Sequence, residues 1–175
     1  MSSATLTFLV IRVLHVLLAA VWVGCTAFAA LFLDRLLADT NRAASASILI
    51  VLARRRFHVF MASIGGFAVV TGLWLYWRFT GHFDPALSAT MGARVFGTGG
   101  AAAIIALIIG GAVIGRALRQ MTALAERGTT LAEGPERTAL LVQVDAARVR
   151  IHSAAWIALV LQVVALSLMA IGHYV

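Results

Sequence analysis

The sequence contains no lysine and few acidic residues: its 14 basic residues are all arginine, against seven aspartates and glutamates in 175 positions. Charged residues make up 12% of the chain and hydrophobic residues 62%, with a mean hydropathy of +0.97. A soluble domain of this length needs far more polar surface, so the composition excludes one and indicates an integral membrane protein. The net charge of +7 would suggest nucleic acid in a soluble protein. Here the arginines follow the loops of a membrane topology, and no nucleic-acid partner is expected.

Cysteine is almost absent, since Cys25 is the only one. A disulfide framework is therefore excluded, and no Cys-x-x-Cys-His motif is present for covalent haem attachment. No cluster of cysteine and histidine offers a structural zinc site. Acidic residues are missing from every long apolar run, which argues against a proton-coupled carrier of the carboxylate type.

What the sequence does contain is four long uncharged runs, over residues 13–33, 57–77, 95–115 and 151–175. Each is long enough to cross ~30 Å of hydrocarbon at ~1.5 Å per residue. We therefore expect an all-α fold, an integral membrane four-helix bundle with up-down topology. It forms a single transmembrane domain with spans at about 7–34, 57–78, 94–118 and 150–175.

The arginines predict the orientation of these spans. Residues 35–56 and 119–149 are rich in arginine, whereas the connection between the second and third spans has only Arg78 and Arg94. The positive-inside rule then places both rich connections in the cytoplasm and both termini on the outer, periplasmic side. The third connection should turn near Gly128 to Pro135, with helices extending beyond the membrane on either side of it.

The two halves of the chain resemble each other. An Arg-Val step opens each pair of spans, at Arg12 and Arg94, and an Arg-x-Arg-x-His pattern opens each returning span, ending at His58 and His152. This spacing predicts two helical hairpins related by a pseudo-twofold axis.

The histidines sort into two layers. His58 and His152 lie just inside the cytoplasmic boundary, whereas His15 and His173 lie near the outer boundary and His82 lies in the outer connection. A histidine at the same depth on two helices, behind arginines, suggests a shared ligand.

Bis-histidine haem b suits this arrangement, because haem needs two axial ligands at similar depth and carries two carboxylates that arginines bind. The second and fourth helices of an up-down bundle are diagonal, which favours an inner haem between His58 and His152, with Arg56 and Arg150 near its carboxylates. An outer haem between His15 and His173, beside Arg12, would need splayed helices. We therefore expect one or two haems.

Copper is the alternative ligand. Met61 follows His58 by three residues, and Met169 precedes His173 by four, so each pair shares a helix face. Thioether and imidazole groups together suit copper, although a methionine at this spacing is more often core filling.

Several short motifs resemble known families. The first span carries Arg12-x-x-His15, then Trp22-x-Gly24 and Leu31-Phe32-Leu33-Asp34-Arg35; the second carries Arg55-Arg56-Phe57 and Thr71-Gly72-Leu73-Trp74. These resemble bacterial membrane proteins of the copper-resistance D (CopD) type and are similar to protoporphyrinogen oxidases of the HemJ type. The first resemblance implies copper handling across the inner membrane. The second implies haem b binding and tetrapyrrole oxidation. Both carry over His15.

We therefore expect a multi-pass protein of the bacterial inner membrane that binds haem b and transfers electrons or oxidises a hydrophobic substrate. Such a haem-dependent oxidoreductase would work with a quinone, a porphyrin or a redox protein. A copper-binding or copper-uptake protein is the alternative, and a small structural subunit of a membrane complex is a third. Gly111 and Gly115 have a spacing that allows two backbones to approach, within one chain or in a homodimer.

Overall fold

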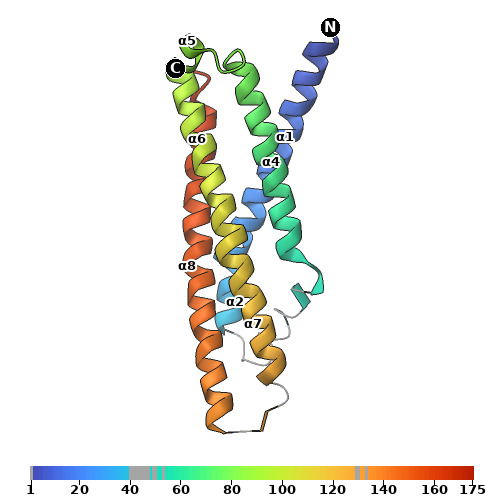
Figure 1. The fold of residues 1–175 in the computed structure, drawn as a ribbon, viewed down its shortest axis with the longest axis vertical. Helices are drawn as coiled ribbons and strands as arrows, with labels where there is room; N and C mark the ends of the chain where they lie inside the picture. The colour runs from blue at the N-terminus through green and yellow to red at the C-terminus, as the bar shows by residue number, and fades with distance from the viewer. Residues whose placement is uncertain (1, 40–47, 49–50, 53, 129–130, 133) are drawn as a thin grey trace.

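The computed structural model describes residues 2–39, 48, 51–52, 54–128, 131–132 and 134–175, and in these residues it contains helices and no strands (Figure 1). The elements follow one another as α1 (Ser3–Phe28), the π-helical η1 (Ala29–Leu33), α2 (Asp34–Asp39), α4 (Phe57–Phe79), α5 (Pro85–Ser88), α6 (Met91–Ile108), the π-helical η2 (Ile109–Ile114), α7 (Gly115–Gly128) and α8 (Pro135–Ile171).

Four helical segments are long and apolar enough to cross a membrane, as the sequence predicts: Ser3–Leu33, Phe57–Phe79, Met91–Leu124 and Pro135–Ile171. The turn predicted near Gly128 to Pro135 lies between the end of α7 and the start of α8. At ~1.5 Å per residue, the 37 residues of α8 span ~56 Å, well beyond ~30 Å of hydrocarbon. All its charged residues precede Ile151, so the surplus length lies at its N-terminal end.

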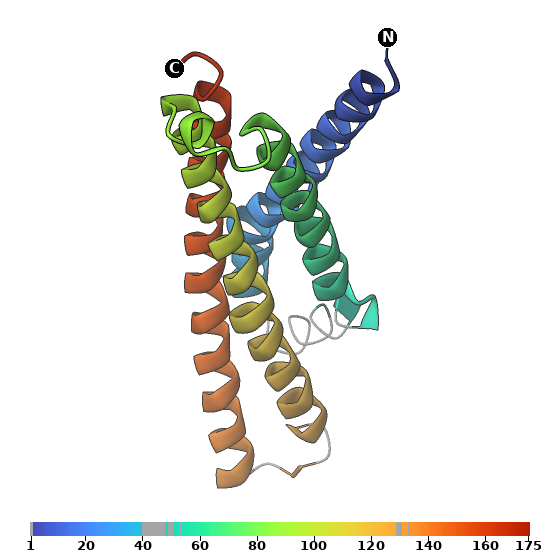
Figure 2. The same ribbon diagram turned by 45° about the horizontal axis from the view of Figure 1, so that its top comes forward.

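The helices form two packed hairpins. α1 packs on α4 and α6 packs on α8, while α4 also contacts α6 and α1 contacts α8. α4 and α8 therefore occupy diagonal corners of the bundle. Both termini lie at one end of the molecule, and the tip of the α7–α8 hairpin lies at the other (Figures 1 and 2).

Small residues let the helices approach closely around one aromatic side chain. Trp22 is buried in a cluster with Ala68, Ala106 and Ala158. A Cβ atom added to Gly65 would lie 2.7 Å from Cε2 of Trp22, so α4 needs a glycine here to accommodate the indole. The core is thus built from alanine and glycine around Trp22.

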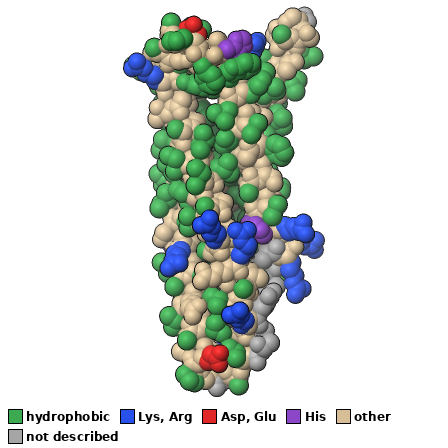
Figure 3. Space-filling model, viewed as in Figure 1, with side chains coloured by type: hydrophobic (Ala, Val, Ile, Leu, Met, Phe, Trp, Pro, Cys, Tyr) green, Lys and Arg blue, Asp and Glu red, His purple; other side chains and the backbone are tan. Residues whose placement is uncertain are grey.

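Apolar side chains also cover much of the outer surface. Figure 3 shows hydrophobic side chains along the upper part of the molecule and arginine side chains gathered at one level below them. A soluble protein rarely exposes such a surface, whereas lipid tails would cover it.

Both long π-helical segments fall at corresponding places in the two hairpins. η1 begins at Ala29 and η2 at Ile109, at closely similar distances after Arg12 and Arg94. A π segment adds a residue to a helical turn and is frequent at functional sites. This shared irregularity is consistent with the pseudo-twofold relation that the sequence predicts.

Candidate functional site

His15 is the most firmly held histidine of the outer layer. Its Nδ1 lies 2.9 Å from the carbonyl oxygen of Ala68 and 3.2 Å from the hydroxyl of Thr71, both on α4. Because a carbonyl can only accept a hydrogen bond, Nδ1 must carry the ring proton. The lone pair is then on Nε2, the tautomer in which a histidine binds a metal while its other nitrogen is oriented by a backbone carbonyl.

Gly72 makes room for this ring. A Cβ atom at position 72 would lie 2.8 Å from Cε1 of His15 and 3.6 Å from its Nε2. The α1–α4 contact therefore fixes the imidazole through one hydrogen-bonded edge and one glycine.

His173 lies beside Arg12 rather than beside His15. The guanidinium of Arg12 donates to Nε2 of His173 across 2.9 Å, and the imidazole packs edge-on against Phe96 with ring centroids 5.3 Å apart. Arg12 precedes His15 by one helical turn. The hydrogen bond between Arg12 and His173 therefore brings Arg12, His15 and His173 to the same end of the bundle.

α1 and α8 diverge toward this end. Figure 2 shows the N-terminal part of α1 leaning away from the C-terminal part of α8, and the hydrogen bond from Arg12 to His173 links α1 to the residues that follow α8. Splayed helices are what the sequence analysis required for a ligand between α1 and α8.

In the inner layer, His58 lies in the first turn of α4 and is half-buried. Its Nδ1 is enclosed and has no hydrogen-bond partner among the residues that the structure describes. An enclosed ring nitrogen without a partner costs free energy, on the order of 1–3 kcal/mol, unless a ligand or a water satisfies it. The preceding Arg56 adopts a left-handed conformation, with φ of 53°, and its side chain is exposed.

His152 lies on α8, at the diagonal corner from α4, and is exposed. Arg150 beside it is exposed as well. The structure therefore places the two inner histidines on the predicted pair of diagonal helices.

The antiparallel register relates both inner histidines to the π-helical segments. Trp22 lies opposite Gly65 and His15 opposite Gly72, and this register places His58 level with Ala29, the first residue of η1. In the other hairpin, Gly99 lies against Ala165. The same register, continued along α6 and α8, places His152 level with η2. Each half of the chain thus has its inner histidine beside an irregular turn of the neighbouring helix.

No group of three or more histidine, cysteine or acidic side chains comes together within the described part of the chain to hold a bare metal ion. Haem makes smaller demands on the protein, because its macrocycle supplies four nitrogens and the chain adds only axial ligands. The two histidines predicted in each layer would be enough for haem in number.

The candidate copper ligands have packing roles. Met61 packs against the core cluster around Trp22. Met169 lies on α8 where it contacts the α6 backbone, with its Cγ 3.6 Å from a Cβ added to Gly99. Cys25 is half-buried in α1.

His82 contacts two residues near the end of α4. Its ring packs at a tilt of 48° against Trp77, with centroids 4.3 Å apart, and its Nε2 lies 3.5 Å from a guanidinium nitrogen of Arg78. The side chain is exposed, in the turn that follows α4.

Two features near the site were not predicted from the sequence. Gln162 is 2% exposed, and within the described part of the chain its Oε1 has no hydrogen-bond partner. Along α8 it lies halfway between His152 and His173. Gln162 is the single side-chain amide in the apolar run 151–175, and this feature of the sequence could have revealed a buried polar group on α8. The π-helical turns leave no comparable sequence signal, because small and branched apolar residues also fill ordinary helices.

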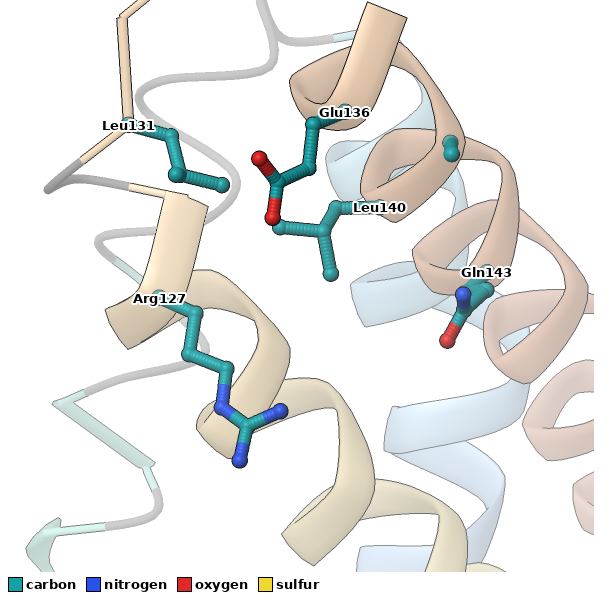
Figure 4. A pocket seen from close by; sticks show the side chains of 6 residues that line it. Arg127, Leu131, Glu136, Leu140 and Gln143 are labelled. Carbon is teal, nitrogen blue, oxygen red and sulfur yellow. The ribbon is translucent and has the colours of Figure 1, made fainter.

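A hollow of about 340 Å³ lies at the tip of the α7–α8 hairpin, lined by Arg127, Leu131, Glu136, Ala139, Leu140 and Gln143 (Figure 4). It contains no histidine and is open to solvent. This hollow is therefore separate from both histidine layers.

Comparison with protein-family models, with curated proteins and with solved structures gives no match for this chain.

Proposed function

We propose that this protein is an integral membrane haem b protein that transfers electrons or oxidises a hydrophobic substrate. The observation that carries the proposal is the repeated inner arrangement, in which His58 and His152 each lie level with a π-helical segment of the neighbouring helix. The enclosed, unpartnered Nδ1 of His58 supports the same site.

In the inner site, His58 and His152 would hold the haem iron, and Arg56 and Arg150 would bind the haem carboxylates at the membrane boundary. In the outer site, His15 offers Nε2, because the Ala68 carbonyl holds its Nδ1. His173 would be the second outer ligand. Its Nε2 accepts a hydrogen bond from Arg12 in this structure, and Arg12 would bind a carboxylate of the haem when His173 holds the iron. Bound haem supplies one-electron chemistry.

The protein's orientation follows the arginines. We place the termini on the periplasmic side of the bacterial inner membrane and the α7–α8 tip in the cytoplasm. The two haem sites then lie near opposite faces of the bilayer, which suits electron transfer across it.

The first test is the absorption spectrum of the protein purified in mild detergent from haem-sufficient cells. We expect a Soret band and, after reduction, the sharp α band of low-spin b-type haem, because two histidines give a strong axial field. A preparation without a Soret band would refute the proposal. Near-stoichiometric copper without haem would instead establish the copper-binding alternative.

Gly72 offers a test that is specific for the outer site. In Gly72→Val, the new side chain must displace the His15 ring, because even a Cβ atom would lie 2.8 Å from Cε1. We expect loss of most of the outer haem, while the inner haem stays. Gly66→Val is the matched control on the same helix, because nothing lies within 4 Å of a Cβ atom at that position. Equal haem content in the two variants would contradict the outer site.

A further inference from the structure

Arginines of two neighbouring helices lie at the same end of the membrane-spanning part. Leu107 of α6 lies against Gly65 of α4, and the antiparallel register continued from this contact places Arg116, in the first turn of α7, level with the start of α4. Figure 3 shows arginine side chains gathered at one level below the apolar surface. Four exposed arginines at or near this level have no role in the proposed haem sites, and we call them the inner arginines: Arg54, Arg55, Arg116 and Arg119.

Exposed apolar side chains adjoin the inner arginines on both helices. Ile108 and Val113 precede Arg116 and are 58% and 42% exposed, while Val59 and Phe60 of α4 are 46% and 48% exposed. These side chains belong to segments that are long and apolar enough to cross a membrane, so acyl chains cover them. The headgroups of the same lipid molecules then lie where the spans end, which is the level of the inner arginines.

The inner arginines are not neutralised by the protein. In the part of the chain that the structure describes, no hydrogen bond or ion pair joins any of these four guanidinium groups to another residue. Like charges held near one another repel, and this repulsion is stronger beside the low dielectric of the hydrocarbon than in bulk water. An anion from outside the chain is therefore needed to balance them.

Phosphate is the anion that suits arginine at this depth. A guanidinium group donates two parallel N–H bonds to two phosphate oxygens, and basic surfaces between membrane-spanning helices bind acidic lipid headgroups in this way. α4 adds the positive end of its helix dipole, because no described side chain caps its N-terminus. We propose that the inner arginines bind the phosphate of an anionic phospholipid, whose acyl chains cover the adjoining apolar surface of α4 and α6.

Native mass spectrometry of the full chain in detergent tests this site, with phosphatidylglycerol as the anionic lipid and phosphatidylcholine as the zwitterionic one. We expect phosphatidylglycerol to bind about tenfold more tightly than phosphatidylcholine. Arg116→Gln/Arg119→Gln and Arg54→Gln/Arg55→Gln should each remove most of this preference, because each loses two of the four charges that attract the headgroup. The two pairs lie on different helices, so a variant that fails to fold leaves the other to decide. Equal affinity of the unaltered protein for the two lipids would overturn the proposal.

Arg78→Gln/Arg94→Gln is the matched control, because it removes the same charge from exposed arginines at the opposite ends of the same two spans. It should keep the full preference for phosphatidylglycerol. An equal loss in this control would show that only the net charge attracts the lipid, and an unchanged preference in both inner variants would place the lipid elsewhere; either result overturns the proposal. Displacement of the lipid by an excess of inorganic phosphate would also overturn it, because the arginines would then recognise a free anion. None of these variants alters Arg56 or Arg150, so the result does not depend on haem.

Discussion

Replacing either His58 or His152 with alanine is expected to remove the same haem absorption from the purified protein. Both residues would ligate one iron, and a bis-histidine site loses its low-spin character when either ligand is removed. The low-spin α band of the inner haem should therefore vanish in both variants. The measurement is the reduced-minus-oxidised spectrum with haem quantified per polypeptide.

His15→Ala and His173→Ala should leave that inner signal intact and lower only the outer one. The 21 residues from His152 to His173 correspond to ~32 Å along one helix, so no single haem can bind both. His82→Ala is the matched control, because His82 is an exposed histidine in the turn after α4 whose ring packs against Trp77.

The opposite pattern would contradict the inner site directly. If His58→Ala and His152→Ala keep the full spectrum while His15→Ala removes it, the repeated Arg-x-Arg-x-His pattern is a topology signal. Only the outer site would then remain.

Trp22→Ala is expected to cause the largest loss of stability of any single substitution in the membrane-spanning part. The indole is buried among Ala68, Ala106 and Ala158, none of which has a side chain that could fill the space. A cavity left by a buried tryptophan costs about 3–5 kcal/mol. For a chain of this length, that corresponds to a fall in the apparent melting temperature on the order of 10 °C.

Thermal unfolding in detergent, followed by circular dichroism, measures this loss. Phe67→Ala is the matched control, because Phe67 is an aromatic side chain of α4 that is 62% exposed and faces away from the core. Its loss should cost less than about 1 kcal/mol. Equal melting temperatures for the two variants would show that the Trp22 cluster does not hold the hairpins together.

The four spans could be predicted from the sequence alone, because they depend on local chemistry. A run of apolar residues longer than the bilayer is thick must cross it as a helix, since lipid offers no partners for backbone hydrogen bonds. Position along a helix then gives the expected depth, from which we predict that His58 lies level with His152 and His15 level with His173.

The contacts of those histidines were decided by tertiary structure. Nothing local to residue 15 indicates that its Nδ1 meets the carbonyl of Ala68, because that bond depends on the α1–α4 register and on the absence of a side chain at Gly72. The bond between Arg12 and His173 likewise joins residues at opposite ends of the chain. The π-helical turns of η1 and η2 also depend on how each helix packs in the bundle, because their residues suit an ordinary helix equally well. The sequence by itself determined which chemical groups lie at each depth, and only the packing of the helices decided which of them touch.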